Sequence, residues 1–352
     1  MPDQKTKTAM FHTLTADTAC NLCHSHEAIA LSDRDRHGRP LLSVMCKGCG
    51  LVRTDPMPDQ NTIDTFYRES YRQDYKGRWT PSRRHILRSG LVALGRLRRL
   101  PQQTWQTRRA LDIGAGGGEF AYLLGRAQGV DVTGVEPNRG YAEHAARSLE
   151  IDIRNEGLDA ARFGAGEFDL VTVYHVLEHL RDPVASLSRI GSWLRPGGLM
   201  VVEVPDIEAT CQAPEHLFHF AHLYNFNAAT LEHAGRRAGL VPVVCWHSPD
   251  GGNVSVTFRV PQTPVAAFPQ AGDGCGLPSN AWRVQATRSS HTTARHYASW
   301  RPWSRTARRL TGRLVETLAL GRLPQDPRAM LDALWGDAHR GGGLGIRTTP
   351  VY

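Results

Sequence analysis

The sequence predicts an α/β fold with a mainly parallel sheet, which follows a cysteine-rich segment and precedes a mostly helical extension. Three observations support this fold class. Between residues 110 and 260, short β-branched runs alternate with segments of helix length. Two Cys-x-x-Cys pairs lie within residues 20–49. Residues 281–340 have a broken helical pattern that contains four tryptophans. We therefore expect a central sheet domain with one attachment at each end.

Length and composition restrict the class of protein. The chain has 352 residues, of which 41% are hydrophobic and 22% charged, so it can form two domains or one domain with an appendage. This composition excludes a wholly disordered or collagen-like chain. No apolar run approaches the roughly 20 residues of a membrane helix, and the N-terminus lacks the pattern of a signal peptide. We expect a cytoplasmic protein without a membrane span.

The first element along the chain is the cysteine-rich segment. The pairs Cys20-x-x-Cys23 and Cys46-x-x-Cys49 are separated by 22 residues, a spacing that is typical of tetrahedral zinc sites. Each pair can form a tight turn that directs two thiolates at one ion. Four cysteines complete the coordination, so we expect a structural zinc ion; the alternative is four free thiols.

The second element is a predicted helical cap over residues 57–109. Apolar residues recur at spacings of three and four in residues 62–75 and again in residues 86–100. The same region is basic, because residues 68–109 hold 12 Lys or Arg and two Asp or Glu. Residues 278–322 hold nine Lys or Arg and one Asp or Glu. The two segments therefore carry net charges of +10 and +8, and the rest of the chain carries −10. Such patches can attract anions, and solvated helix faces have the same composition.

Residues 110–260 form the predicted central domain. Asp182 stands at an N-cap position before Pro183, and Gly239 follows the end of a helix. The predicted strands are Ala110–Ile113, Asp131–Val135, Phe168–Tyr174, Leu199–Val204, Val241–Trp246 and Asn253–Val260. The predicted helices are Glu119–Gln128, Pro183–Leu194 and Ala228–Ala238.

A linker rich in Pro, Gly and Ala follows at residues 261–280, and helices follow the linker. The chain therefore has four predicted parts. They are residues 1–56 for the tail and zinc-binding segment, 57–109 for the helical cap, 110–260 for the central domain, and 261–352 for the linker and helical extension.

A glycine-rich turn follows the first strand of the central domain. The alternating residues there are Asp112, Gly114, Gly116 and Gly118. Glycines permit a tight bend and a close approach of the backbone to a ligand. With Ala121 the turn also satisfies the dinucleotide-binding pattern, but an acid at the strand end suits a cationic amino group better than a pyrophosphate. Glu136 ends the next strand, where it can accept hydrogen bonds from ribose hydroxyls in either case.

These motifs resemble those of the class I S-adenosylmethionine-dependent methyltransferases, in the branch with an N-terminal zinc-binding segment. The resemblance covers about residues 19–260. The motifs that carry it are the cysteine pairs with Asp55-Pro-Met-Pro58, the helix with Phe66, Tyr67 and Tyr71, Leu111–Glu119, Phe168–Val171 with His175-Val-Leu-Glu-His179, and Leu194-Arg-Pro-Gly-Gly198. The resemblance implies a Rossmann-like sheet of seven strands with the last one antiparallel, methyl transfer from S-adenosylmethionine, and bound zinc.

The resemblance also implies which residues bind the methyl donor. Asp112 and the glycine turn would line its methionine and ribose, and Glu136 would hold the ribose. The residues assigned to the donor in this way are Asp112, Gly114, Ala115, Gly116, Gly118, Glu136, Pro137, Gly157, Leu158, Tyr174, His175, Tyr67 and Tyr71. Plain helix packing explains the last two tyrosines equally well.

Histidines supply the candidate catalytic groups, because imidazole titrates near neutral pH. The family places acceptor-side residues after the fifth strand, and three histidines recur there at a spacing of three. We predict His222 as a general base and Tyr224 as an acceptor contact, with His175 and His219 as further candidates. A second metal site made by His216, His219 and His222 is less favoured, and an aromatic lid without acid–base chemistry is a further alternative.

The predicted function is methyl transfer to a small molecule, sugar or glycan, by O-methylation with a histidine base. Alignment of donor and acceptor can contribute roughly 7–11 kcal/mol, and a base typically contributes about 10²–10⁴-fold. The alternatives are an RNA methyltransferase that uses the basic patches, a nicotinamide-dependent oxidoreductase, and a non-catalytic zinc-ribbon adaptor. Asp112 and the absence of a Tyr-x-x-x-Lys pair disfavour the oxidoreductase, and the intact glycine turn disfavours the adaptor.

Overall fold

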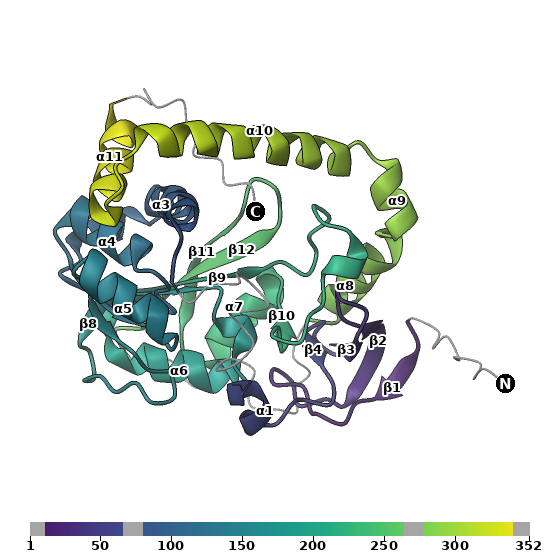
Figure 1. Ribbon diagram of the computed structural model, residues 1–352. Coiled ribbons are helices and arrows are strands. Elements are labelled where there is room, and N and C mark those ends of the chain that lie inside the picture. Colours follow the sequence, from purple (N-terminus) through teal and green to yellow (C-terminus); the bar gives the residue numbers. More distant parts are fainter. Residues whose placement is uncertain (1–10, 66–79, 264–276, 341–352) are drawn as a thin grey trace. The chain divides into compact units, whose positions relative to one another are not determined.

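A computed structural model describes residues 11–65, 80–263 and 277–340 (Figure 1). The chain divides into two compact units, and each unit combines segments that are far apart in the sequence. The first unit comprises residues 1–64, 175–191 and 202–302, and the second comprises residues 65–174, 192–201 and 303–352. We describe each unit separately.

The first unit contains a five-stranded sheet that the sequence analysis did not predict. Its strands lie in the order β1-β2-β3-β4-β10 and pair antiparallel; β1 to β4 are the purple strands of Figure 1. The strands are β1 (Thr13–Thr15), β2 (Glu27–Arg34), β3 (Pro40–Cys46), β4 (Val52–Thr54) and β10 (Tyr224–Asn225). The sheet is stabilised by strand pairing and by apolar packing of residues such as Met45 and Phe218.

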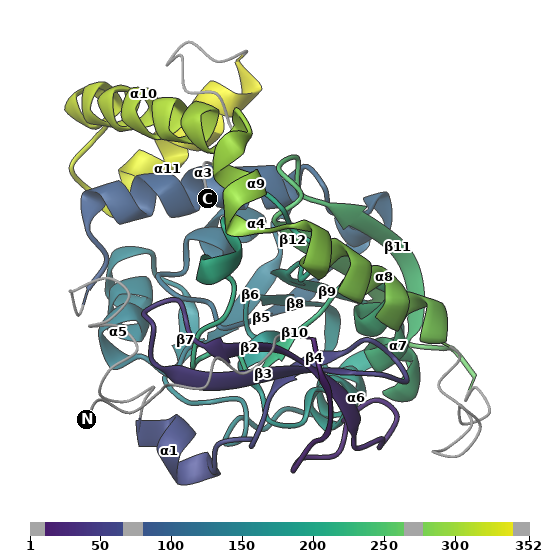
Figure 2. The same cartoon turned by 90° about the vertical axis from the view of Figure 1, so that its right-hand side faces the viewer.

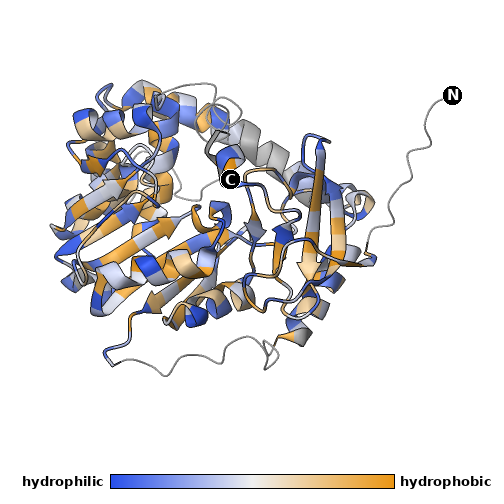
Figure 3. Ribbon diagram, turned by 90° about the horizontal axis from the view of Figure 1, so that it is seen from below, coloured by the Kyte–Doolittle hydropathy of each residue, from blue (hydrophilic) through white to orange (hydrophobic). Residues whose placement is uncertain are grey.

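The predicted seven-stranded sheet is present. The strand that comes last in the chain pairs antiparallel with the strand at the edge of the sheet. The strand order is β11-β12-β9-β8-β5-β6-β7. The pairs β5–β6, β5–β8 and β6–β7 are parallel, and β11–β12 is antiparallel. The strands are β5 (Arg109–Ile113), β6 (Asp131–Val135), β7 (Asp152–Arg154), β8 (Phe168–Tyr174), β9 (Leu194–Pro205), β11 (Val241–His247) and β12 (Asn253–Arg259). Figure 3 shows hydrophobic residues concentrated on the strands.

The second unit packs its helices around one large apolar cluster. Helix α4 buries Phe120, Leu123 and Leu124 there, as its spacing predicts. The side chain of Arg83 at the start of α3 donates to the carbonyls of Leu320 and Leu323, each at 3.0 Å. Figure 2 shows α3 and α11 close together. The helices are α3 (Arg83–Leu97), η2 (Gln102–Gln106), α4 (Glu119–Gln128), α5 (Arg139–Ser148), α11 (Pro327–His339) and most of α10 (Arg301–Arg322).

Two predicted signals, Asp182 and Gly239, lie at helix ends in the first unit. The Asp182 carboxylate accepts a hydrogen bond from the Ala185 N–H at 2.9 Å, and Asn227 caps α7. Gly239 has a φ of 83°, the left-handed conformation that favours glycine after a helix. The helices are α1 (Gln60–Thr65), η3 (Leu177–His179), most of α6 (Pro183–Trp193), η4 (Pro214–His216), α7 (Ala228–Arg237), α8 (Pro278–Ser290) and α9 (Thr293–Ala298).

Some predicted boundaries differ from the structure. Strand β9 begins directly after α6 at Leu194, five residues before the predicted start. Residues 195–198, which lie between the predicted helix and the predicted strand, therefore belong to the strand. The predicted helix over residues 62–75 begins as α1, and its remainder, like most of the predicted linker, lies outside the described residues. No helix among the described residues is long and apolar enough to cross a membrane.

Candidate functional site

The glycine turn lies between β5 and α4 in the second unit. The backbone φ angles of Gly114, Gly116 and Gly118 are 73°, 58° and 83°. These are left-handed conformations that residues other than glycine rarely adopt. A Cβ atom added at Gly118 would lie 2.8 Å from the Cβ of Ala145, whereas one at Gly116 would meet no heavy atom within 4 Å. Gly118 is therefore required for packing, and Gly116 borders open space beside the turn.

Asp112 lies at the carboxyl end of β5, with its carboxyl group buried. The Thr172 hydroxyl donates to it at 2.7 Å. Burial raises the pKa of Asp112 to about 6, although the hydrogen bond from Thr172 and the charge of Arg96 act in the opposite direction. The Arg96 guanidinium lies over the Tyr174 ring at 4.0 Å from its centroid. A carboxyl group with this pKa is mostly ionised at neutral pH and favours a cationic partner.

Glu136 fixes the shape of the glycine turn from the end of β6. Its Oε2 accepts the Gly116 N–H at 2.9 Å and its Oε1 accepts the Asn138 N–H at 2.8 Å. Each carboxylate oxygen has further lone pairs for ligand hydroxyls. Helix α5 begins at Arg139 with Asn138 as N-cap, so Pro137, which the resemblance places at the start of this helix, precedes it instead.

The other residues predicted to bind the donor have structural contacts of their own. The Ala115 N–H donates to the Val135 carbonyl at 3.0 Å, and the Gly157 carbonyl closes a turn by accepting from Ala160 and Ala161 at 3.1 Å. Leu158 is buried. The Tyr174 ring packs edge-on against Phe120 at 4.9 Å. Tyr67 and Tyr71 lie outside the described residues, and the donor contacts of this whole set stay predictions.

These features of the second unit fit the donor that the resemblance implies. A buried carboxyl group, a glycine turn that borders open space, and a second carboxylate at the next strand can accept hydrogen bonds from an amino group and from ribose hydroxyls. S-adenosylmethionine offers these donor groups together with a positive charge. The carboxyl ends of parallel strands are also where α/β sheets bind ligands.

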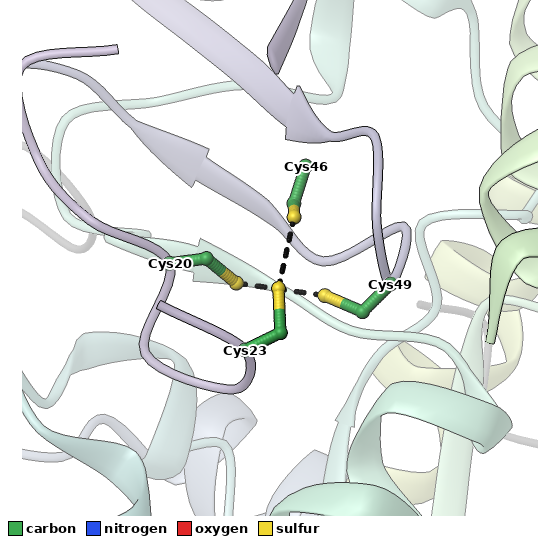
Figure 4. Close-up of side chains that lie close together, drawn as sticks. All are labelled: Cys20, Cys23, Cys46 and Cys49. Atoms are coloured by element: carbon green, nitrogen blue, oxygen red, sulfur yellow. Dashed lines mark hydrogen bonds between the residues drawn. The ribbon is translucent and has the colours of Figure 1, made fainter. Parts of the chain in front are cut away.

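The four cysteines of the first unit lie together (Figure 4). Their Sγ atoms are all within 4.8 Å of one another, with 3.5 Å between Cys20 and Cys49 and 3.3 Å between Cys23 and Cys46. Tetrahedral zinc with Zn–S bonds of 2.3 Å separates its sulfur ligands by about 3.8 Å. Three of the thiols are buried, and Cys23 is half-buried. The donor set therefore fits zinc.

The four thiols change one another's pKa values because their sulfur atoms lie close together. Hydrogen bonding from Cys20 lowers the pKa of Cys46 to about 7, and hydrogen bonds from Cys20 and Cys46 also lower the pKa of Cys23. The nearby histidines have other contacts: His26 Nδ1 donates to the Ala16 carbonyl at 2.8 Å, and Arg237 donates to His24 Nε2 at 3.2 Å. Neither belongs to the cysteine group.

A second cluster of titratable groups lies elsewhere in the first unit, around Glu178. Its side chain is 1% exposed, and neither carboxylate oxygen has a hydrogen-bond partner in the described part of the chain. Three imidazoles surround Glu178 Oε1: His175 Nδ1 at 3.5 Å, His179 Nε2 at 3.8 Å and His222 Nε2 at 4.0 Å. We call Glu178, His175, His179, His219 and His222 the histidine cluster.

His175 lies between two carboxylates in this cluster and has a strained backbone. Its φ is 57°, which is uncommon for a residue other than glycine. Burial alone would lower the pKa of His175, but the carboxylates of Glu178 and Glu203 outweigh burial and raise the pKa to about 9. The Nε2 of His175 lies 3.4 Å from Glu203 Oε1. Strained residues cluster at functional sites, so this geometry supports a functional role.

His219 and His222 are neutral at neutral pH. Burial, followed by the charges of Arg36, His179 and His37, lowers the pKa of His219 to about 3. Burial and the neighbouring histidines place the pKa of His222 well below its usual range. The two rings have centroids 3.7 Å apart.

Tyr224 is buried, and its hydroxyl donates to the Arg181 carbonyl at 3.0 Å. Its contact with the acceptor stays a prediction. The hydroxyl oxygen can accept a hydrogen bond while it donates to Arg181. Neither Glu178 nor Glu203 is among the functional residues predicted from the sequence. Two signals were present: Glu203 is an acid within an apolar strand, and Glu178 follows His175 by three residues.

The basic segments are partly engaged in internal contacts. Arg88 forms a bidentate pair with Glu316 at 2.6 and 2.8 Å, Arg283 pairs with Glu208 at 3.0 Å, and Arg288 donates to the Ala209 carbonyl at 2.9 Å. These contacts give arginines of both patches a structural role and leave less positive charge for an anionic partner.

A family model described as a methyltransferase domain matches residues 83–244. The chain is also similar to the ubiquinone biosynthesis O-methyltransferases of Dinoroseobacter shibae and Cereibacter sphaeroides. The first is 39% identical over 98 residues, which are 26% of this chain and 39% of the relative. The second is 40% identical over 102 residues, 28% of this chain and 41% of the relative. The chain spans about two fifths of the length of the curated relatives it matches.

Among solved structures, the chain is similar to the 1,6-didemethyltoxoflavin-N1-methyltransferase of Burkholderia thailandensis with bound 1,6-didemethyltoxoflavin and S-adenosylhomocysteine. The two chains are 20% identical, and the match covers 62% of this chain and 96% of the other, with a TM-score of 0.44.

Proposed function

We propose that this chain, in which residues 83–244 form a methyltransferase domain, transfers a methyl group from S-adenosylmethionine to a hydroxyl of a small molecule, sugar or glycan. One observation carries the proposal: the buried Asp112 carboxyl group lies at the strand end before a glycine turn that borders open space at Gly116. The names of the two relatives support transfer to oxygen, since both are O-methyltransferases of ubiquinone biosynthesis.

The residues of the second unit would hold the donor. Asp112 would attract its cationic side, Glu136 would accept from the ribose hydroxyls, and the backbone at Gly116 would lie against it without a side chain between them. When bound, the donor supplies a methyl group activated by a sulfonium. The protein then contributes mainly alignment, which can supply roughly 7–11 kcal/mol. Gly157, Leu158 and Tyr174 are further proposed contacts.

His222 is the proposed base for the acceptor hydroxyl. Its low pKa keeps the imidazole neutral, so a ring nitrogen has a lone pair for the proton. The same low pKa weakens the base, so a partner that stabilises the charged ring is needed. Glu178 Oε1, 4.0 Å from His222 Nε2, would stabilise the imidazolium that forms, as the carboxylate of a catalytic triad does. His175 is protonated and cannot serve as this base. We propose that its charge orients Glu178 and Glu203.

The cysteine group is proposed to bind zinc as a structural ion. The four thiols supply complete tetrahedral coordination and leave no position for a substrate. Zinc would stabilise the first unit by linking two turns that flank β2 and β3. It would supply no chemistry to methyl transfer.

A pair of glycine variants tests the donor site. In Gly116→Ala, the added methyl group occupies the open space, so we expect the affinity for S-adenosylmethionine to fall at least tenfold, and the left-handed φ should cost about 1–2 kcal/mol in stability. In Gly118→Ala, the same backbone strain is joined by a collision with Ala145, so we expect a further loss of about 1–3 kcal/mol in stability. Titration calorimetry and denaturant unfolding measure the two effects. Equal affinity in Gly116→Ala and the wild type would contradict the donor site.

A histidine variant tests the base. We expect His222→Ala to lose about 10²–10⁴-fold in turnover while it still binds S-adenosylmethionine. The matched control is His216→Ala, because His216 is exposed and lies on the same segment outside the cluster. Unchanged turnover in His222→Ala, or loss of donor binding there, would remove His222 from the catalytic role.

A further inference from the structure

We infer that Glu178, His179 and His222 bind a divalent transition-metal cation. One ligand atom from each residue lies within 4.8 Å of the other two. Two imidazoles and one carboxylate are a donor set of catalytic zinc sites and of non-haem iron sites. All three residues belong to the first unit, and none of them is a ligand in the cysteine group.

The Glu178 carboxylate supplies the strongest observation. It is almost fully buried, and both of its oxygens lack a hydrogen-bond partner within the described residues. A buried carboxylate is costly unless it is paired or bound to a metal. The nearest positive group, His175, lies at 3.5 Å and also faces Glu203 at 3.4 Å. A cation bound to Glu178 would satisfy its oxygens and leave His175 with Glu203 as its partner.

His179 has the orientation of a metal ligand. Its Nδ1 lies 2.7 Å from the Ala221 carbonyl, which can only accept, so Nδ1 carries the proton that it donates. In the neutral imidazole, Nε2 then has the lone pair, and this atom faces Glu178 Oε1 at 3.8 Å. A hydrogen bond from the second ring nitrogen to a backbone carbonyl is how proteins commonly orient histidine ligands.

His222 completes the set with its Nε2 4.0 Å from Glu178 Oε1. Its ring is held by the rings of His179 and His219, with centroid distances of 4.9 and 3.7 Å. Bonds of about 2.1 Å at a tetrahedral angle separate two ligands by about 3.4 Å. The two imidazoles therefore need to approach Glu178 Oε1 by only about half an ångström to bind an ion.

The set of ligands differs from the second metal site considered from the sequence. His216 is exposed, and neither His216 nor His219 belongs to the three ligands. Glu178 and His179 replace them, because η3 brings this pair to within reach of His222. Three protein ligands leave at least one position open. A metal-bound ring nitrogen cannot take up a proton, so the role of His222 as a base, which belongs to the proposed function, applies to the protein without the ion.

The test uses cobalt as the probe, in full-length protein whose cysteine group has first been loaded with one equivalent of zinc. We expect one further equivalent of Co²⁺ to bind, with visible d–d absorption and without a thiolate-to-cobalt charge-transfer band. In Glu178→Gln and His222→Gln, the affinity should fall at least tenfold while the circular dichroism spectrum is unchanged. His216→Ala, the matched control, should bind as the wild type does.

Two results would overturn the inference. One is the absence of Co²⁺ binding beyond the cysteine group. The other is binding that Glu178→Gln and His222→Gln both leave intact, or that His216→Ala abolishes. The measurement of Co²⁺ binding requires neither the methyl donor nor the acceptor. Its result is therefore independent of the proposed function, because a protein that transfers no methyl group could still bind the ion.

Discussion

The two units of this protein are stabilised in different ways. The second unit has one large apolar cluster, to which α3, α4, α11 and the strands contribute buried residues such as Leu87, Leu124 and Leu331. The first unit also buries apolar residues, such as Leu231, Val256 and Phe258, and it additionally contains the four cysteines and the histidine cluster. The difference indicates that the first unit depends on particular polar and metal-binding groups in addition to apolar burial.

The first unit contains several buried polar groups in specific positions. Arg53 is fully buried in β4, and among the described residues its Nε and Nη1 have no hydrogen-bond partner. Asn280 of α8 donates to the Cys49 carbonyl at 2.9 Å and accepts from Asn227 at 2.8 Å. Glu178 is a third such group. Each contact has a specific geometry, so the first unit should respond sharply to single changes at these positions.

The largest expected effect is the loss of zinc. Structural zinc contributes on the order of 10 kcal/mol in small zinc-binding modules, so a chelator or Cys46→Ser should abolish cooperative unfolding of the first unit. Amide hydrogen exchange should rise in β2 and β3 and stay low in β5 and α4. The control is Cys245→Ala, since Cys245 lies outside the cysteine group. Metal-free protein with unchanged protection in β2 and β3 would contradict the comparison.

A core truncation should give the reverse pattern. Leu124 is fully buried in the apolar cluster of the second unit, so Leu124→Ala should cost about 2–5 kcal/mol. Hydrogen exchange should rise in α4 and its neighbouring strands, and zinc content should stay at one equivalent. Loss of zinc from this variant would show that the two units are not stabilised separately.

A smaller effect is expected from the polar contact of α8 with the zinc-binding turn. Asn280→Ala leaves the Cys49 carbonyl and the Asn227 amide without this partner, which should cost about 1–3 kcal/mol in unfolding free energy. Ser289→Ala on the exposed side of the same helix should change stability by less than about 0.5 kcal/mol. Denaturant unfolding compares the two variants, and equal values would remove the polar contact from the account.

The smallest effect concerns pH. The pKa of Asp112 is raised to about 6, so its carboxyl group is charged above pH 6 and becomes protonated below it. The affinity for the cationic donor should therefore be constant above pH 6 and fall about tenfold for each pH unit below it. Asp112→Asn should bind more weakly at neutral pH and lose this dependence. An unchanged slope in the variant would assign the effect to another group.

Local motifs could be predicted from the sequence. The glycine turn and the cysteine pairs are each encoded by residues a few positions apart, and the strands and helices of residues 110–260 follow from their hydrophobic spacing. The capping residues Asp182 and Gly239 were also recognisable, since their effect on the backbone is intrinsic to the residue.

Features that depend on distant contacts could not be predicted. Strands β2 and β3 are stable because they pair with each other and pack on residues near 207–218 and 281–284. The metal-ligand geometry of the histidine cluster joins Glu178 to His222, which is 44 positions away, so no local spacing encodes it. The buried charge of Arg53 likewise appears only when the sheet has formed.

The central claim is that the turn from Asp112 to Gly118 binds the methyl donor. A crystal structure with saturating S-adenosylhomocysteine tests it most directly. The account predicts density for the ligand against Gly116, with its ribose hydroxyls bonded to Glu136 and its amino group on the side of Asp112. Ligand bound elsewhere, or a glycine turn left empty at saturation, would contradict it.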